Sequence, residues 1–166
     1  ASSAVVRTSA AAPSLSFEEL AAVTEPSFSK AGFKPAIFAR SDLPGSSSLS
    51  ITEMATAMKK PERFVGLHFF NPVNRMPLVE VIPGAKTSPE AVAHVAALGR
   101  KLGKTVVVVK DCPGFLVNRI LLPMINEAVF VLWQGTANIA DIDKACHLGL
   151  NHPMGPLELA DFVWLD

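Results

Sequence analysis

The sequence has little of what several classes of protein require. Its 166 residues include two cysteines, Cys112 and Cys146, which form neither a disulfide framework nor a metal-ligand pattern with the four histidines. Acidic and basic residues balance at a formal net charge of zero without a basic run, which argues against nucleic acid as the main partner. No apolar stretch approaches the roughly 20 residues that a membrane-spanning helix needs. We therefore expect two reduced thiols, no metal, no nucleic-acid partner and no membrane span.

The first residues also lack a feature, the continuous apolar core of a secretory signal peptide. Residues 1–16 read ASSAVVRTSAAAPSLS, which is rich in alanine and serine and carries a single arginine. We expect residues 1–15 to form a disordered or poorly fitting lead, and only weak features favour a transit peptide. Few cysteines and a neutral charge fit a reducing cytoplasm and an organelle matrix equally, and cytoplasm is our working assignment.

What the sequence does have is enough apolar material for a core, since 49% of its residues are hydrophobic. Along residues 16–110, short apolar runs alternate with helix-start patterns. Capping boxes at Ser16–Glu19 and Ser50–Glu53 begin helices, the second running to about Lys59, and Ser88 followed by proline begins a third. The continuous run TVVVV predicts a strand that is buried on both faces. The expected strands are Ala36–Ala39, Phe64–Phe69, Leu78–Ile82 and Thr105–Val109.

After the turn DCPGF, every plausible element is helical. We expect helices over about Phe115–Trp133 and Ala140–His147, and a third in LELADFVWL. Strands mixed with helices, followed by helices alone, predict an α/β domain over residues 16–110 and a helical domain over residues 111–166.

One histidine and one glutamate stand in otherwise apolar strand patterns, His68 in FVGLHF and Glu80 in LVEVI. A buried carboxylate without a partner is costly, so Glu80 must face a polar group. If the two strands pair, His68 and Glu80 meet on one face. A carboxylate hydrogen-bonded to an imidazole orients the ring and stabilises its protonated form, as a general base requires. The same spacing also fits a purely structural pair that holds the two strands together.

Two further polar features have both functional and structural interpretations. The serines of Ser46–Ser50 lie where a strand passes into a helix, a common position for ligand-facing hydroxyls in open α/β sheets. These serines are equally explained without a ligand, as solvent-exposed residues of a turn, and Ser50 is explained as the cap of the following helix. Asn118 stands in the first turn of an apolar helix, either as a local cap or as an amide aimed into a cleft between domains. Taken alone, Asn118 is better explained as a cap.

Three segments together carry a resemblance to a known family: HFFNPVNRMPLVEVI, KLGKTVVVVKDCPGFLVNRILLPMINEA and NHPMGPLELAD. In this order they resemble the L-3-hydroxyacyl-CoA dehydrogenases. That family includes single-function 3-hydroxybutyryl-CoA dehydrogenases and the dehydrogenase part of multifunctional β-oxidation proteins. The similarity covers about Ser47 to Asp166. One of its motifs is closer to the single-function branch and another to the multifunctional branch, so the motifs do not separate the two.

This resemblance implies both a fold and an activity. The fold would be the C-terminal part of a Rossmann-like NAD-binding domain followed by the start of an all-α dehydrogenase domain. The activity would be the NAD-dependent interconversion of (S)-3-hydroxyacyl-CoA and 3-ketoacyl-CoA, an oxidoreductase step of fatty-acid β-oxidation. The resemblance implies an acyl-CoA substrate, and either a homo-oligomer or a longer multifunctional chain.

The resemblance also implies a role for each matching residue. His68 would take the proton from the substrate 3-hydroxyl as hydride leaves C3, and Glu80 would hold His68 and support it as imidazolium. Ser47 would hydrogen-bond the reacting oxygen and lie near the cofactor, and Asn118 would add a second polar contact. Asn71 would touch the nicotinamide end of NAD.

The sequence departs from the family pattern at three places. It has no G-x-G-x-x-G fingerprint, which in the family seats the dinucleotide pyrophosphate, so we expect the chain to be a fragment of a longer gene product or to depend on a partner. RSDLPGSSSL replaces the usual S-N-T-S-S-L, an insertion that changes the spacing before Ser47. Trp164 stands where the family generally carries glycine.

Two other functions are open at this point. A truncated segment without catalysis could act only as an association or dimerisation module, through exposed sheet and helical surface. A different hydroxyacid dehydrogenase on the same architecture is a further alternative, but one that uses lysine as its base would lack the spacing between His68 and Glu80. Binding of NADH by the folded chain would favour the 3-hydroxyacyl-CoA dehydrogenase. Self-association without an effect of the cofactor would favour the association module.

Overall fold

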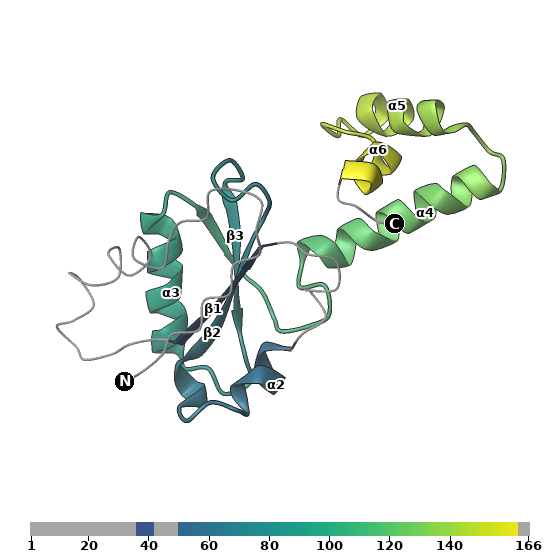
Figure 1. Ribbon diagram of the computed structural model, residues 1–166. Helices are drawn as coiled ribbons and strands as arrows, with labels where there is room; N and C mark the ends of the chain where they lie inside the picture. Colours follow the sequence, from purple (N-terminus) through teal and green to yellow (C-terminus); the bar gives the residue numbers. More distant parts are fainter. Residues whose placement is uncertain (1–35, 42–49, 163–166) are drawn as a thin grey trace. The chain divides into compact units, whose positions relative to one another are not determined.

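The computed structural model describes residues 36–41 and 50–162 of the chain (Figure 1). The expected helix after Ser16, the serine-rich loop with Ser47, and Trp164 lie outside the described residues. The described chain forms a four-stranded sheet with flanking helices, followed by three further helices. The predicted order of an α/β part and a helical part is therefore confirmed.

Contacts within the chain divide it into two compact units, Ala1–Phe115 and Leu116–Asp166. The described part of the first unit contains a sheet with the strand order β1-β2-β3-β4. β1 and β2 are parallel, β2 and β3 are antiparallel, and β3 and β4 are parallel. Helices lie in both parallel connections, because parallel strands need a long crossover. The elements are β1 Ala36–Ser41, α2 Ile51–Ala55, η3 Pro61–Arg63, β2 Phe64–Phe69, β3 Leu78–Pro83, α3 Pro89–Lys101 and β4 Thr105–Val108.

One face of this sheet packs against α3, which Figure 1 shows running alongside the strands. Every second side chain of β2 and β3 points to this face, as the two-residue period of a strand dictates. Apolar residues at these alternate positions therefore meet the apolar side of the helix. The buried residues of this core are Val65, Leu67, Phe69, Val79, Val81, Ala91, Val95 and Leu98.

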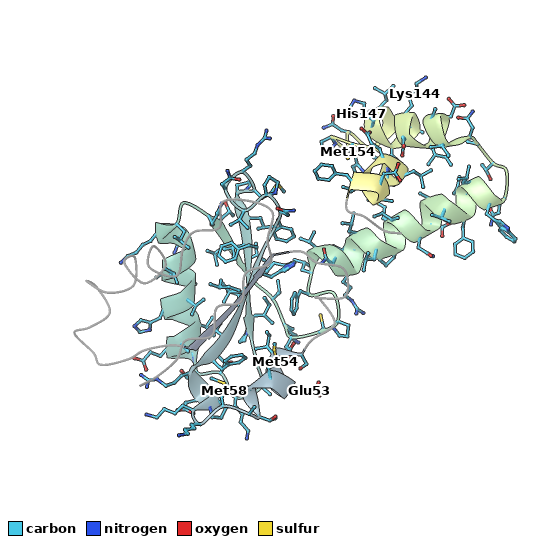
Figure 2. All side chains as sticks on the ribbon, viewed as in Figure 1. Glu53, Met54, Met58, Lys144, His147 and Met154 are labelled. Carbon is cyan, nitrogen blue, oxygen red and sulfur yellow. The ribbon has the colours of Figure 1, made fainter. Side chains whose placement is uncertain are left out.

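The opposite face carries the other alternate positions, among them Gly66, His68 and Glu80, and α2 packs on this side. Gly66 allows the close approach of the helix, because a Cβ there would lie 2.6 Å from Cδ1 of Ile51. Met54, labelled in Figure 2, packs against the same cluster. The buried apolar residues of this second cluster are Ile51, Ala55, Phe64, Ile82 and Phe115.

Strand β4 differs from the expectation for the run TVVVV. In the described sheet it lies at the edge beside β3, and it ends at Val108. Val108 is 53% exposed, whereas Val106 packs against the α3 core. The prediction of burial on both faces was wrong, because a continuous apolar run does not reveal whether other elements cover both faces of a strand.

Local sequence sets the helix starts as predicted. Ser50 and Ser88 are N-caps, and each hydroxyl accepts a hydrogen bond at 3.2 Å from the backbone N–H three residues later. The helix after Ser50 is shorter than expected, because α2 ends at Ala55 and the chain continues in tight turns to Met58. Helix α3 stops before Gly103, whose φ of +73° is a left-handed conformation that glycine adopts without strain.

The described part of the second unit is helical, and its helices agree with the predicted ones to within a few residues. The longest of them ends before Gly135, as predicted, where φ is +69°. Among the described residues, no helix has the length and apolar character needed to cross a membrane. The helices are α4 Val117–Trp133, α5 Ile139–Gly149 and α6 Pro156–Phe162.

Asp143 joins the last two helices. Its carboxylate accepts hydrogen bonds from the backbone N–H groups of Leu157 at 2.8 Å and Glu158 at 3.1 Å. These N–H groups belong to the first turn of α6, which has no partners for them within the helix. Gly155 lies against the same side chain, so closely that a Cβ there would overlap Asp143. The carboxylate of α5 therefore fixes where α6 begins.

Candidate active site

His68 and Glu80 lie directly opposite each other in the antiparallel pair of β2 and β3. Nδ1 of His68 is 2.7 Å from Oε2 of Glu80. Both residues are buried, with 1% and 0% of their surfaces exposed. The predicted contact is confirmed, and it forms because the two residues occupy the same face of neighbouring strands.

This contact also sets the chemistry of the imidazole. When Nδ1 donates to the carboxylate, the neutral ring carries its lone pair on Nε2. A carboxylate at this distance favours the protonated ring once Nε2 has accepted a proton. Removal of either partner would take away this hydrogen bond from a buried polar group, which is costly. The geometry of His68 and Glu80 therefore suits a general base, and it also ties β2 to β3.

Within the described residues, the rings of Phe70 and Phe115 contact the imidazole of His68. The ring centroid of Phe70 is 4.8 Å from that of His68, with an angle of 64° between the planes. The ring centroid of Phe115 is 5.3 Å away, with an angle of 59°. The φ of Phe115 is +47°, a conformation that costs a non-glycine residue about 1–3 kcal/mol. The packing around Phe115 must therefore hold it in this conformation.

Asp111 connects the turn before Phe115 to the start of α2. Its carboxylate accepts hydrogen bonds from Ser50 Oγ at 2.7 Å, Ile51 N at 3.1 Å and Thr52 N at 2.7 Å. Partial burial raises the pKa of the Asp111 carboxyl, but these hydrogen bonds and one from the Thr52 side chain outweigh it. The pKa of Asp111 therefore lies below its ordinary value. The side chain satisfies N–H groups that the first turn of a helix leaves without partners.

Asn71 lies near the start of the loop between β2 and β3, and it is exposed. Ligands of open α/β sheets bind beyond the carboxyl ends of the strands, which is where Asn71 follows β2. Lys104 holds this loop, because its Nζ donates to the carbonyls of Val73 at 2.6 Å and Met76 at 2.8 Å. An exposed amide on a loop held in this way fits a polar contact with a dinucleotide.

The predicted site residues have different outcomes. His68 and Glu80 are brought into contact, and Ser47 lies outside the described residues. Asn118 is half-buried on α4 in the second unit. The N-cap of α4 is Leu116, so the interpretation of Asn118 as the helix cap was wrong.

Sequence reasoning missed Phe70, Phe115 and Asp111. Asp111 is a residue type that caps helices, but here it caps a helix 59 to 61 residues earlier in the chain. The Pro-Gly pair before Phe115 marked a turn, and nothing local indicated a contact with His68. Both contacts join distant segments, so neither hydrophobic period nor helix propensity reports them.

Family models match both parts of the chain. The model described as 3-hydroxyacyl-CoA dehydrogenase, NAD binding domain, matches residues 17–112, and the model described as 3-hydroxyacyl-CoA dehydrogenase, C-terminal domain, matches residues 114–166. The chain belongs to the 3-hydroxyacyl-CoA dehydrogenase family. The family and the fold class predicted from sequence, a Rossmann-like part followed by a helical part, are thereby confirmed.

Individual members of the 3-hydroxyacyl-CoA dehydrogenase family are similar over most of this chain. It is 56% identical over 120 residues to the probable 3-hydroxybutyryl-CoA dehydrogenase of Bacillus subtilis (strain 168), covering 72% of this chain and 42% of that protein. It is 55% identical over 120 residues to the fatty acid oxidation complex subunit alpha of Psychrobacter cryohalolentis, covering 72% and 16%. The crystal structure of (S)-3-hydroxybutyryl-CoA dehydrogenase from Ralstonia eutropha matches with a TM-score of 0.71 and 51% identity, covering 77% and 44%. The chain thus spans less than half the length of these relatives.

Proposed function

We propose that this chain supplies the His68–Glu80 pair of an NAD-dependent 3-hydroxyacyl-CoA dehydrogenase that acts in fatty-acid β-oxidation. The enzyme interconverts (S)-3-hydroxyacyl-CoA and 3-ketoacyl-CoA. The observation that carries the proposal is the buried contact of 2.7 Å between His68 Nδ1 and Glu80 Oε2, within the segment that the NAD-binding family model matches. The names of the relatives, 3-hydroxybutyryl-CoA dehydrogenase and fatty acid oxidation complex subunit alpha, support the substrate class.

In the oxidation direction, His68 acts as the general base. Its Nε2 accepts the proton of the substrate 3-hydroxyl while the C3–H electron pair leaves as hydride and the C3–O bond becomes a carbonyl. NAD, when bound, supplies the acceptor for that hydride. Glu80 holds Nδ1 and stabilises the imidazolium that forms. In the reverse direction, the imidazolium returns its proton to the oxygen.

Three further residues belong to the proposed site. Ser47 hydrogen-bonds the reacting oxygen near the cofactor, and Asn118 adds a second polar contact from the helical unit. Asn71 contacts the nicotinamide end of the dinucleotide. The exposure of Asn71 just beyond the carboxyl end of β2 supports this last role.

The proposal extends to location and assembly. We place the protein in the cytoplasm, acting either as a homo-oligomer or within a longer multifunctional chain. The relative named fatty acid oxidation complex subunit alpha, of which this chain covers 16%, supports the second of these alternatives.

Replacement of the base tests the proposal directly. In the full-length protein, we expect His68→Gln to lower kcat by about 10²–10⁴-fold, the usual contribution of a general base, while NADH affinity stays nearly unchanged. Steady-state kinetics with acetoacetyl-CoA and NADH give kcat, and NADH fluorescence gives the affinity. His94→Gln, on α3, is the matched control and should retain the wild-type rate. A wild-type rate for His68→Gln would contradict the proposal.

A second candidate function is that of an association module without catalysis. Exposed apolar side chains on α4 and α5 favour it, with Trp133 79%, Leu148 73% and Ile120 63% exposed. Absence of NADH binding and of dehydrogenase activity in a folded, self-associating full-length protein would support the module and exclude the dehydrogenase.

A further inference from the structure

The loop between β2 and β3 is anchored on both sides of Asn71. On one side, Phe70 is buried, and its ring contacts the His68 imidazole with 4.8 Å between the centroids. On the other side, the side chain of Val73 packs against the core under α3. The exposed Asn71 therefore lies between two positions that the interior of the first unit holds.

Lys104 adds a further anchor to this loop. It lies between α3 and β4, and its Nζ donates to the carbonyls of Val73 at 2.6 Å and Met76 at 2.8 Å. Both hydrogen bonds have a charged donor, which makes them stronger than bonds between neutral groups. The backbone N–H of Thr105, the next residue, donates to Pro77 O at 2.7 Å. The start of β4 thus holds the second half of the loop.

The part of the loop that Lys104 holds is a hydrogen-bonded turn. The backbone N–H groups of Arg75 and Met76 both donate to Pro72 O, at 2.9 and 3.0 Å. Pro72 is joined directly to Asn71, so a shift of this turn moves the residue whose amide is proposed to meet the cofactor. The ammonium of Lys104 therefore restrains Asn71 through the turn that follows it.

We infer that Lys104 is a positioning residue, which holds the turn after Asn71 and so places the Asn71 amide for contact with the nicotinamide end of NAD. The inference rests on the proposed function, in which Asn71 makes that contact. The base lies apart from this restraint, because His68 and Glu80 are held by the pairing of β2 with β3. Loss of the Lys104 ammonium should therefore weaken cofactor binding and spare the chemical step.

Removal of the ammonium should release the loop without unfolding the unit. The hydrogen bond to Met76 O is exposed, so water can take the place of the donor there. Lys104→Met keeps an unbranched apolar stem and removes the three donors of the ammonium. If the released loop holds the productive position about a tenth of the time, the apparent Kd for NADH rises about tenfold.

Titration of the full-length protein with NADH, followed by fluorescence, tests this expectation. Lys104→Met should raise the Kd for NADH about tenfold, with kcat at saturating NADH and KM for acetoacetyl-CoA within about twofold of wild type. Lys104→Arg keeps a charged donor and should bind NADH more tightly than the methionine variant. Lys86→Met removes an exposed lysine between β3 and α3, and this matched control should bind NADH as wild type does. A wild-type Kd for Lys104→Met, or no gain from arginine over methionine, would overturn the inference.

A double-mutant cycle separates positioning from direct attraction between the ammonium and the phosphates of the dinucleotide. If Lys104 acts through Asn71, Lys104→Met should raise the Kd for NADH much less when residue 71 is already changed by Asn71→Ala. Direct attraction would give the same increase in both backgrounds, and that result would overturn the inference. A wild-type Kd for Asn71→Ala would also overturn it, because the contact on which it rests would be absent.

Hydrogen exchange of the full-length protein tests the anchoring without cofactor or turnover. We expect Lys104→Met to speed exchange of the backbone amides of residues 70–77, whereas Lys86→Met should leave them as in wild type. Wild-type exchange in this loop for Lys104→Met would overturn the inference and leave the dehydrogenase standing. If the loop loosens and NADH binding weakens as expected, but His68→Gln retains the wild-type kcat, the proposed function fails and the placement of the cofactor by Lys104 stands.

Discussion

Glu80 is a carboxylate within an otherwise apolar strand, and the residue across the strand pair accounts for it. His68 supplies a hydrogen-bond partner at 2.7 Å, so the carboxylate is buried without being left unpaired. The same contact prepares the imidazole to accept a proton at Nε2. At the scale of single residues, one pair therefore serves both the stability of the sheet and the proposed chemistry.

The charge of Glu80 can be separated from its shape. Glu80→Gln keeps the size of the side chain and an oxygen that can accept from Nδ1, but it removes the charge that stabilises imidazolium. We expect kcat for oxidation to fall about tenfold or more, and the acid limb of its pH–rate profile to move to lower pH, because protonation of His68 becomes less favourable. Steady-state rates across the pH range measure both. An unchanged profile would reduce Glu80 to a structural partner.

At the scale of elements, the start of α2 has both a local and a distant cap. Ser50 accepts from the backbone three residues later, a pattern that the sequence predicts. Asp111 accepts from Ile51 N and Thr52 N across 60 and 59 residues, and this contact ties the turn before Phe115 to the helix. The distant cap makes the geometry of the turn and of the helix start depend on each other.

Removal of the distant cap should show a characteristic pH dependence. Asp111→Asn should lower the free energy of unfolding by about 1 kcal/mol near neutral pH, the typical worth of a helix cap. Because the pKa of Asp111 is lower in the folded chain than its ordinary value of 3.8, the stabilisation is complete above that value. It is lost as the pH falls through the folded-state pKa.

Urea unfolding of the chain at about pH 6 and about pH 3 measures this dependence. The difference between wild type and Asp111→Asn should be smaller at the lower pH. Asp161→Asn, an exposed position on α6, is the control and should show little difference at either pH. A difference for Asp111→Asn that grows as the pH falls would refute the assigned sign.

The contact between α5 and α6 allows a test with two glycines. At Gly155 a Cβ would overlap the Asp143 side chain, which caps α6, whereas at Gly149 nothing lies within 4 Å. We expect Gly155→Ala to lower stability by about 1–3 kcal/mol, as for overpacking, and Gly149→Ala to be neutral or slightly stabilising. Thermal unfolding followed by circular dichroism compares the two variants. Equal stability of both would show that Asp143 moves without cost.

At the scale of the whole molecule, apolar surface is unevenly distributed. The described face of the sheet under α3 is well covered, whereas α4 carries large apolar side chains on its surface. An exposed apolar set of this size is a common mark of association between proteins. The exposed large apolar residues of α4 and its N-cap are Leu116, Ile120, Leu122, Val129, Phe130 and Trp133.

Self-association of the chain follows as a prediction from this surface. We expect concentration-dependent association of the purified chain, weakened by Trp133→Ser, because Trp133 is 79% exposed and has the largest side chain of the set. Analytical ultracentrifugation over a range of concentrations measures it. Met76→Ser, in the exposed loop after β2, is the control for loss of an exposed apolar side chain. A strictly monomeric wild-type chain at all concentrations would exclude this role for α4.

Local patterns in the sequence account for most of the helices and strands, and for the expectation that His68 faces Glu80. Serine N-caps, glycine stops and apolar strand patterns are local, so they predicted the helices and the strands, and they predicted that His68 and Glu80 would meet if the two strands pair. The edge position of TVVVV in the described sheet, the capping of α2 by Asp111 and the contact of Phe115 with His68 follow from the tertiary fold. Each of these depends on which distant segments become neighbours, and that is set by the packing of the whole unit rather than by the residues on either side.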